Sequence, residues 1–385
     1  MARTSAASAG PGPAGPSSSG PHGSPLATPA TRAICPPIRA ITVIPGTPGS
    51  EQLVELDGPP HDGPALLAET LALGVCGTAR EIVAGLYGAP PPGRDRLVLG
   101  HEWLGRVVEA PDGIEAGALV AGIVRRPDPV PCPCCARGEF DMCRNGRYRE
   151  RGIKELDGYG AELVTLEPDY AVRLDASLRS VGVLTEPASV VAKAWEQIDA
   201  VVAQGCRPLD TVLVTGAGPI GLLAALLGVQ RGRTVHVFDR HADGPKRRLA
   251  EALGATYHAG TVREACDAAE PDIVVECTGA PEVVVDAIQY TAPGAIVCLT
   301  GVSPRGRTLS LDVGSINNEL VLENDVVLGS VNANRRHFEA AVEALTRADR
   351  AWLESLITRR VPLQRWAEAL DRRPDDIKTI IDFEA

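Results

Sequence analysis

The sequence predicts an α/β protein in which a doubly wound parallel sheet accompanies a second, β-rich domain. Two observations support this prediction: a glycine-rich turn between two apolar segments, and a regular alternation of strand and helix patterns after it. The strand patterns lie at residues 211–215, 234–238, 272–277 and 295–300. Strands that alternate with helices form parallel sheets, whose ligands bind at the carboxyl ends of the strands.

The glycine-rich turn has the sequence Gly216-Ala217-Gly218-Pro219-Ile220-Gly221. In a G-x-G-x-x-G turn the first glycine permits the tight turn, the second lets backbone approach a pyrophosphate, and the third lets the helix pack on the strand. Free N–H groups and the helix dipole then face the negative charge. An ordinary turn is the alternative in a chain with 40 glycines. The strand and helix around the turn favour a dinucleotide site that includes Gly216, Gly218, Pro219, Ile220 and Gly221.

The end of the second strand pattern bears on the choice of dinucleotide. Asp239 lies about 20 residues after the glycines, where a carboxylate binds the adenosine ribose hydroxyls. A carboxylate there repels a 2′-phosphate, which favours NAD. Arg240 follows directly, and Lys246, Arg247 and Arg248 are near it in sequence. An arginine in this loop can accommodate the 2′-phosphate of NADP, so NADP is the alternative, unless these basic residues only form a solvated helix face.

Composition limits the class of partner and the compartment. At 385 residues the chain can form two domains, and its net charge of −11 argues against nucleic acid or an anionic membrane as the main partner. No apolar stretch approaches the ~20 residues of a membrane span. Ten cysteines, three of them close together at Cys132, Cys134 and Cys135, indicate metal binding more than disulfides. With no secretory signal pattern, they predict a reducing compartment, the cytoplasm.

The order of patterns along the chain predicts the domain organisation. Residues 1–33 are mostly Ala, Gly, Pro and Ser, which is typical of a disordered tail. Short β patterns broken by Gly and Pro then continue to about residue 175, as in a compact β-rich domain. A helical pattern at 187–200 leads into the dinucleotide domain, and the helix (363–370) and strand (379–383) of the C-terminal segment are expected to return to the first domain. The predicted domains are 34–185, completed by 333–385, and 186–332.

Three potential metal ligands precede the glycine-rich turn. Cys76 follows a β pattern, His101 follows another 25 residues later, and Glu186 stands just before a helix. One thiolate, one imidazole and one carboxylate leave the fourth position of a zinc ion open, as in catalytic zinc sites. Such a zinc acts as a Lewis acid that holds a substrate alkoxide while hydride leaves its carbon. Singly, the cysteine could be a core residue, the histidine a packing residue and the glutamate a helix-terminal acid. Together they favour zinc.

Larger motifs in the same order resemble the zinc-dependent medium-chain dehydrogenases. These motifs are Gly74-Val75-Cys76-Gly77-Thr78, Leu97-Val98-Leu99-Gly100-His101-Glu102, the cysteine-rich lobe and the glycine-rich turn. Further segments, at 80–85, 151–154, 185–187, 329–332, 337–341 and 376–379, resemble the glucose 1-dehydrogenase branch. The resemblance covers about residues 39–384. It implies a GroES-like β domain that carries zinc and a Rossmann domain, with the active site between them. It also implies a homo-oligomer, either a dimer or a tetramer, formed through edge strands of the Rossmann domain.

The resemblance also implies roles for single residues. Cys76, His101 and Glu186 correspond to the ligands of the catalytic zinc, and Glu102 to an adjacent carboxylate that can approach the metal. Thr78 corresponds to a hydroxyl that relays the alcohol proton toward the cofactor ribose. A hydroxyl suits this role because it both donates and accepts.

Other correspondences concern the substrate and the nicotinamide. Glu150 and Asn332 correspond to partners of the sugar hydroxyls. Strand ends and the resemblance together place Thr278, Gly301 and Asn332 at the nicotinamide end of the site.

The sequence departs from the family pattern at three places. Relatives carry an aspartate that supports the zinc histidine where this chain has Ala79, and loss of such support commonly costs 10–100-fold in metal affinity or activity. Val190 replaces a polar residue that some sugar-oxidising relatives carry. The lobe usually reads C-x2-C-x2-C-x7-C, but here Pro129 replaces the first cysteine. A structural zinc would then bind Cys132, Cys135 and Cys143, with Cys134 or Asp128 as substitutes for the fourth ligand.

These observations support three functional hypotheses. The leading one is a zinc-dependent NAD(P) dehydrogenase that oxidises the anomeric carbon of an aldose, D-glucose first, to a lactone. The second is a polyol or amino-sugar dehydrogenase of specialised metabolism with the same chemistry, which Val190 and Ala79 motivate. The third is a dinucleotide-binding protein without catalysis, which the set of Cys76, Thr78, His101 and Glu186 argues against.

Overall fold

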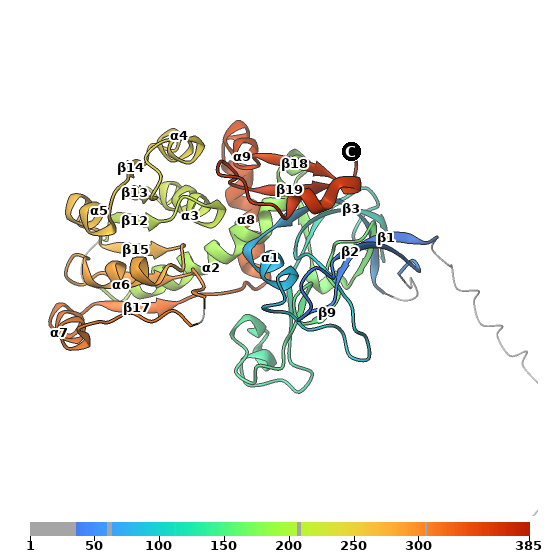
Figure 1. The fold of residues 1–385 in the computed structure, drawn as a ribbon, viewed down its shortest axis with the longest axis horizontal. Helices are drawn as coiled ribbons and strands as arrows, with labels where there is room; N and C mark the ends of the chain where they lie inside the picture. The colour runs from blue at the N-terminus through green and yellow to red at the C-terminus, as the bar shows by residue number, and fades with distance from the viewer. Residues whose placement is uncertain (1–35, 60–63, 112, 206–208, 305) are drawn as a thin grey trace, which may run out of the picture. The chain divides into compact units, whose positions relative to one another are not determined.

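The computed structural model describes residues 36–59, 64–111, 113–205, 209–304 and 306–385. The described residues form a largely antiparallel β region and a parallel sheet flanked by helices (Figure 1). This arrangement confirms the predicted α/β fold class. The prediction of a disordered tail at 1–33 concerns residues outside those described.

The β region contains a seven-stranded sheet that combines strands from the first half of the chain with the two C-terminal strands. In spatial order its strands are β11 (Ala171–Leu174), β6 (Leu119–Gly122), β5 (Glu102–Glu109), β3 (Leu66–Val75), β19 (Thr379–Asp382) and β18 (Arg359–Pro362), and β10 (Leu163–Leu166) also pairs with β3. β19 runs antiparallel to β3, so the C-terminal segment joins the sheet formed by the first half of the chain (Figure 1).

Two three-stranded sheets complete the β region. One contains β2 (Gln52–Leu56), β1 (Ile38–Val43) and β4 (Leu97–Val98), and the other β7 (Arg125–Arg126), β8 (Arg149–Arg151) and β9 (Glu155–Leu156).

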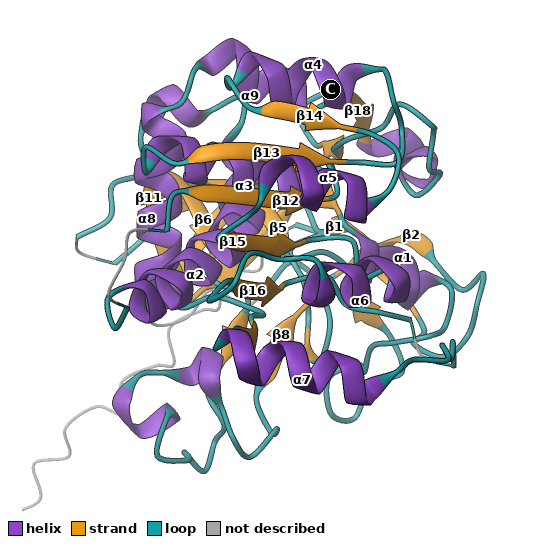
Figure 2. Cartoon of the chain, turned by 90° about the vertical axis from the view of Figure 1, so that its left-hand side faces the viewer, coloured by secondary structure: helices purple, strands orange, loops and turns teal. Residues whose placement is uncertain are grey.

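The second sheet has six strands that are all parallel. In spatial order they are β14 (Thr256–His258), β13 (Thr234–Phe238), β12 (Thr211–Thr215), β15 (Ile273–Glu276), β16 (Ile296–Leu299) and β17 (Val326–Gly329). Figure 2 shows β14, β13, β12, β15 and β16 side by side. The chain starts at β12, moves outward to β14 and returns to β15. A ligand binds at such a reversal of strand order, beside the carboxyl ends of β12 and β15.

Nine α-helices and six short 3₁₀ segments lie within the described residues. The α-helices are α1 (Gly77–Val83), α2 (Thr185–Val202), α3 (Pro219–Gln230), α4 (Pro245–Ala252), α5 (Val262–Ala269), α6 (Pro281–Gln289), α7 (Val313–Glu323), α8 (Arg335–Arg347) and α9 (Arg350–Leu356). The 3₁₀ segments are η1 (Cys135–Arg137), η2 (Phe140–Met142), η3 (Pro168–Tyr170), η4 (Ala176–Leu178), η5 (Gly182–Leu184) and η6 (Leu363–Ala369). None of the described helices has both the length and the apolarity of a membrane span.

Helix α2 connects the two sheet systems. It contacts β5 and β6 of the β region as well as α3 and β16 of the parallel sheet. Its buried residues, among them Val191 and Trp195, belong to one hydrophobic cluster with Val120 of β6 and Val212 of β12. The position of α2 therefore fixes the residues at its first turn, including Glu186, relative to both sheets.

The predicted helix at 363–370 is the one element whose type differs. The structure forms a 3₁₀ segment there, and Arg365 inside it has non-helical angles of φ −117° and ψ 22°. Leu363, Trp366 and Ala369 are its buried residues. A 3₁₀ helix has three residues per turn, so this i, i+3 spacing places all three side chains on one face.

Candidate active site

The Cys76–His101 pair is formed by the register of two neighbouring strands. Gly74 of β3 pairs with Glu102 of β5, which brings the residues after β3 next to those before β5. Cys76 caps the N-terminus of α1, where its Sγ accepts a bond from the Ala79 N–H at 3.4 Å. The same Sγ lies 3.1 Å from Nε2 of His101. Two predicted zinc ligands are therefore in direct contact.

These donors suit a zinc ion. Zinc–sulfur and zinc–nitrogen bonds of about 2.3 and 2.0 Å place two tetrahedral ligands roughly 3.5 Å apart, so a small opening of the pair would admit the metal. Glu186 lies in the first turn of α2. Among the described residues, however, it does not complete a group whose ligand atoms all lie within 4.8 Å of one another.

Negative charge gathers around the buried His101 imidazole. Burial alone would lower the pKa of His101, but negative charge at Cys76, followed by Glu186 and Glu102, raises it to about 10. Burial raises the pKa of Glu186 to about 7. His101 opposes this rise, whereas the negative charges of Glu102 and Glu150 add to it. A site in which several anionic groups surround one imidazole attracts a cation, and a divalent metal meets that demand better than one proton.

Glu102 already has a cationic partner. Its buried carboxylate forms an ion pair with Nζ of the fully buried Lys378, next to β19, and this ammonium also donates to the Val75 carbonyl at 3.4 Å. A Cβ at Gly74 would meet both the Glu102 and the Lys378 side chains, so glycine leaves the space that this pair occupies. Our sequence analysis missed Lys378. The available signal was a lone lysine between apolar residues at the start of a strand, since buried lysines are nearly always paired.

The second nitrogen of the His101 ring is unsupported. Nδ1 of His101 is buried and has no hydrogen-bond partner among the described residues. Ala79, the position where the family pattern has aspartate, is buried in α1 and offers no acceptor side chain. Most buried polar atoms in proteins have a partner, so this unpaired nitrogen is a specific weakness of the site.

Glu150 and Asn332 lie 182 positions apart in the chain, yet they are hydrogen-bonded. Nδ2 of Asn332 donates to Oε1 of Glu150 at 2.8 Å, and Nη2 of Arg125 lies 3.0 Å from the same oxygen. Asn332 has φ 63°, a left-handed conformation that asparagine adopts more readily than most residues. Its own Oδ1 accepts the N–H of Ala333 at 2.8 Å. The two predicted sugar partners therefore form one preorganised unit.

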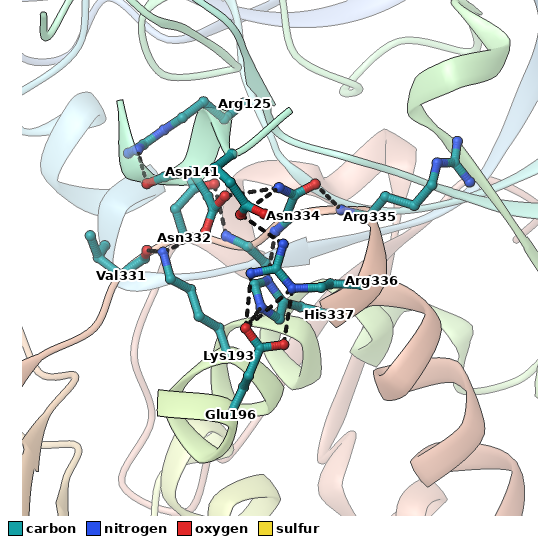
Figure 3. Close-up of polar contacts among 12 residues, drawn as sticks. Arg125, Asp141, Lys193, Glu196, Val331, Asn332, Asn334, Arg335, Arg336 and His337 are labelled. Atoms are coloured by element: carbon teal, nitrogen blue, oxygen red, sulfur yellow. Dashed lines mark hydrogen bonds and ion pairs between the residues drawn. The ribbon is translucent and has the colours of Figure 1, made fainter. Parts of the chain in front are cut away.

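A buried network supports this pair (Figure 3). Lys193 of α2 forms an ion pair with Asp141 of η2 at 2.8 Å and donates to the Val331 carbonyl at 3.0 Å. Asn334 donates to Oδ1 of Asp141 at 3.0 Å, and Arg125 donates to the Asp141 carbonyl at 2.8 Å. The sequence analysis missed Arg125 and Lys193. Arg125 directly follows the apolar run Ile123-Val124, and Lys193 is a single basic residue within an apolar helical segment, which is the signal that could have identified them.

The glycine-rich turn has the predicted geometry. Gly216 has φ 93°, and a Cβ at Gly221 would lie 1.7 Å from the Gly216 carbonyl oxygen. Gly218 caps α3 without a side-chain bond and has open space where a Cβ would stand. Backbone at the N-terminus of α3 is therefore open to the close approach of a ligand, as an anion site requires.

Thr278 and Gly301 meet beside this turn through Glu276, whose carboxylate and backbone carbonyl both accept hydrogen bonds. Glu276, at the end of β15, accepts the N–H groups of Thr278 at 2.6 Å and Gly279 at 3.1 Å. Its carbonyl accepts the N–H of Gly301 at 3.0 Å. A Cβ at Gly216 would lie 2.7 Å from Cγ2 of Thr278. Three of the predicted cofactor residues therefore come together at the ends of β12, β15 and β16.

Asp239 and Arg240 follow β13 and differ in environment. Asp239 is buried, and one of its carboxylate oxygens accepts the Ala217 N–H of the glycine-rich turn at 3.0 Å. Burial opposes ionisation of Asp239, but hydrogen bonds from His241 and Lys246 outweigh it and lower the pKa of this carboxyl. Arg240 is exposed and has no side-chain partner among the described residues.

The cysteine lobe contains three clustered sulfur atoms. The Sγ atoms of Cys132, Cys135 and Cys143 all lie within 4.8 Å of one another. Cys132 accepts the N–H groups of Arg144 at 3.4 Å and Cys135 at 3.5 Å. These bonds lower the pKa of Cys132 to about 6. Thiolates stabilised in this way are metal ligands, and the cluster can bind a soft divalent ion such as zinc.

In the part of the chain that the structure describes, no fourth protein ligand joins the three sulfur atoms of the lobe. Among the described residues, neither Cys134 nor Asp128 joins the group of three sulfur atoms. The Asp128 carboxylate instead accepts the N–H of Val130 at 2.8 Å and Nε of Arg147 at 3.2 Å. The structure therefore supports neither of the two substitutes for the missing first cysteine.

Family models match the two parts of the chain separately. The model described as "Alcohol dehydrogenase GroES-like domain" matches residues 63–176, and the model described as "Glucose dehydrogenase C-terminus" matches residues 179–383.

Similar proteins agree with these matches. A glucose 1-dehydrogenase of Methanocella arvoryzae is 39% identical over 359 residues, which cover 90% of this chain and 100% of that protein. A glucose 1-dehydrogenase of Thermoproteus tenax is 40% identical over 352 residues, which cover 89% and 99% of the two chains. The structure of Haloferax mediterranei glucose dehydrogenase in complex with NADP, Zn and gluconolactone superimposes with a TM-score of 0.84 at 34% identity, over 90% of this chain and 99% of that one. The chain therefore belongs to the glucose 1-dehydrogenase branch of the zinc-dependent medium-chain dehydrogenase family.

Proposed function

We propose that this protein oxidises the anomeric carbon of D-glucose to gluconolactone and transfers the hydride to NAD(P)+. The observation that carries the proposal is the direct contact of Cys76 with His101, on which the negative charges of Glu186 and Glu102 also act. The Haloferax mediterranei relative, whose structure contains NADP, Zn and gluconolactone, supports the same reaction.

The residues of the site divide the chemistry among them. Cys76, His101 and Glu186 would hold the catalytic zinc, with Glu102 beside them. A zinc ion in such a site acts as a Lewis acid toward the substrate oxygen. Thr78, partly buried in the first turn of α1, accepts the proton of the anomeric hydroxyl and passes it toward the cofactor ribose.

The sugar and the nicotinamide are held by residues from both halves of the chain. Glu150 accepts hydrogen bonds from sugar hydroxyls, and Asn332 both donates and accepts. The nicotinamide lies near Thr278, Gly301 and Asn332. The anomeric C–H bond breaks with its electron pair going to the nicotinamide ring, the hydroxyl oxygen loses its proton, and the new C=O bond completes the lactone. In this proposal the first domain, residues 34–185 with 333–385, contributes Glu150. The second domain, residues 186–332, contributes Thr278, Gly301 and Asn332.

The cofactor assignment rests on the turn at Gly216–Gly221 and on Asp239. The buried carboxylate favours NAD, and Arg240, which follows it, accommodates NADP. A second zinc would bind the thiolates of Cys132, Cys135 and Cys143.

An exposed apolar surface supports a homo-oligomer. β17 is one of the two edge strands of the parallel sheet, with Val327 39% exposed, and Val321 and Leu322 of α7, the helix before it, are 64% and 71% exposed. Pairing of β17 with a second copy would satisfy the free edge and cover these side chains, giving a dimer, or a tetramer built as a dimer of dimers. The eight described cysteines are free thiols, which supports a reducing, cytoplasmic location.

A substrate panel tests the proposal. D-glucose, sorbitol, glucosamine and simple alcohols are each offered with NAD+ and NADP+, and the reduced nicotinamide is followed by absorbance. We expect the largest kcat/KM with D-glucose. A larger kcat/KM with a polyol or amino sugar would favour the alternative that Val190 and Ala79 motivate. No reduction with any of them would reject the catalytic proposal.

A further inference from the structure

The carboxylate of Asp239 has no free acceptor position. Oδ2 accepts the Ala217 N–H at 3.0 Å and Nζ of Lys246 at 3.0 Å. Oδ1 accepts the His241 N–H at 3.1 Å and lies 2.8 Å from Nδ1 of the same histidine. A carboxylate offers about four acceptor sites, so these contacts fill them. A ribose hydroxyl can bind Asp239 only after one of the present donors leaves.

The donors differ in how easily they can leave. The N–H groups of Ala217 and His241 belong to the backbone of the turns that follow β12 and β13, so they are fixed by the fold. The two side-chain donors can change rotamer. The His241 side chain is 48% exposed, whereas that of Lys246, in the first turn of α4, is only 15% exposed. The imidazole is therefore the more replaceable of the two.

The same donors suit a phosphate. An ammonium has three N–H donors, and Lys246 uses one of them toward Asp239. Because the Lys246 ammonium balances the charge of the Asp239 carboxylate, Asp239 no longer repels a 2′-phosphate. The remaining N–H donors of Lys246 can bind the phosphate through charge-assisted hydrogen bonds. Arg240 is exposed beside this group and adds positive charge. One set of side chains can therefore serve either form of the ribose.

We propose that Lys246 and His241 set the choice between the two dinucleotides. Lys246 stays on Asp239 and binds the 2′-phosphate of NADP+, while His241 is the group that the ribose hydroxyls of NAD+ displace. The inference rests on the proposed dinucleotide site at Gly216–Gly221 and deepens it, because it names the residues that read the 2′ position. It predicts a protein that binds both cofactors.

Equilibrium binding of NAD+ and NADP+ to the zinc-loaded full chain tests this inference without turnover. Calorimetric titrations without sugar and at fixed ionic strength give Kd for each cofactor with the wild type, Lys246→Met and His241→Ala. We expect Lys246→Met to raise Kd for NADP+ by about tenfold or more, as loss of a charge-assisted hydrogen bond implies, while Kd for NAD+ stays constant or falls. We expect His241→Ala to lower Kd for NAD+ by about threefold or more, since nothing then has to be displaced.

Two further variants separate recognition from folding. Lys246→Arg keeps the charge and should retain NADP+ binding, which would show that the loss in Lys246→Met is not a folding defect. Arg247→Met removes a cation from the same helix whose partners are Glu251 and Asp243, so it should leave the ratio of the two Kd values unchanged.

The failures are distinguishable. An equal weakening of both cofactors in Lys246→Met, or an unchanged ratio in both Lys246→Met and His241→Ala, would overturn the inference and leave the dinucleotide site in place. A wild type that binds neither cofactor would overturn the dinucleotide site together with the inference.

Discussion

The two halves of the active site are supported to different degrees. The Glu150–Asn332 pair is held by Arg125 and by a buried network that includes Lys193 and Asp141 (Figure 3). The Cys76–His101 pair has no comparable support from the described residues, among which Nδ1 of the buried His101 finds no partner. The proposed sugar-binding side is thus preorganised by the protein itself, whereas the proposed metal-binding side would depend on the ion for its final geometry.

The largest effect should come from breaking the ion pair that supports the sugar side. The Lys193 and Asp141 side chains are 4% and 0% exposed, so Lys193→Met leaves a buried carboxylate without its counter-charge. We expect the free energy of unfolding to fall by about 3–5 kcal/mol in denaturant titrations. The double variant Lys193→Met/Asp141→Asn should recover much of this loss. A Lys193→Met protein as stable as the wild type would show that the network does not support the site.

The next effect concerns substrate orientation rather than stability. Asn332→Gly keeps a residue that tolerates φ 63° but removes the amide that donates to Glu150. We expect kcat/KM for glucose to fall by about 10–100-fold, as loss of a hydrogen bond to a charged group implies, with little change in unfolding free energy. Stopped-flow or steady-state kinetics, compared with thermal unfolding of the same variant, provide the measurement. Unchanged kcat/KM would remove Asn332 from the sugar site.

On the metal side, support can be added instead of removed. Ala79→Asp offers an acceptor in the position that the family pattern gives to the zinc histidine. We expect the Kd for zinc at the catalytic site to fall by about tenfold, measured by competition with a chromogenic chelator. Ala79→Asn, which places a neutral acceptor there, should give a smaller gain. An aspartate variant with unchanged zinc affinity would show that the unpaired Nδ1 of His101 does not limit metal binding.

The smallest effect is a pH dependence at the rim of the sugar-side network. Hydrogen bonds from Arg336 and His337 lower the pKa of Glu196 from 4.5 to about 2. The bond from Arg336 is the largest contribution, and it outweighs the opposing effect of burial. Its folded-state pKa is depressed, so this carboxylate stabilises the fold above about pH 4.5, and the contribution is lost as the pH falls toward 2. The side chain is about half exposed, so solvent screening keeps the contribution below about 1 kcal/mol. Glu196→Gln should flatten the stability profile between these pH values, and an unchanged profile would contradict the assignment.

Local patterns in the sequence predicted much of the fold and part of the site. The strands at 211–215 and 234–238 agree with β12 and β13 because mostly buried parallel strands are rich in β-branched and apolar residues and are bounded by turn residues. The glycine-rich turn was predictable because Gly216 and Gly221 each have a steric reason, and Gly218 leaves open space at the start of the helix. The zinc ligands, the lobe and the sugar pair came from motif order, and their roles stay predictions.

The supporting residues could not be predicted in the same way. Arg125, Lys193 and Lys378 act through partners that are 16 to 276 positions away, and no local pattern identifies such partners. The saturation of Asp239 by His241 and Lys246 depends on side-chain directions in the loop after β13, which spacing alone does not determine. The sequence also could not predict that residues 363–369 form a 3₁₀ helix, since the i, i+3 spacing of their buried side chains suits both an α-helix and a 3₁₀ helix.

The most direct test of the account is the zinc content per chain of the wild type, Cys76→Ala and Cys143→Ala, measured beside glucose-dependent reduction of NAD(P)+. We expect two zinc ions in the wild type and one in each variant. Only Cys76→Ala should lose activity, because Cys143 belongs to the lobe and Cys76 to the reacting site. Zinc content and turnover that do not change in Cys76→Ala would contradict the assignment of the catalytic centre.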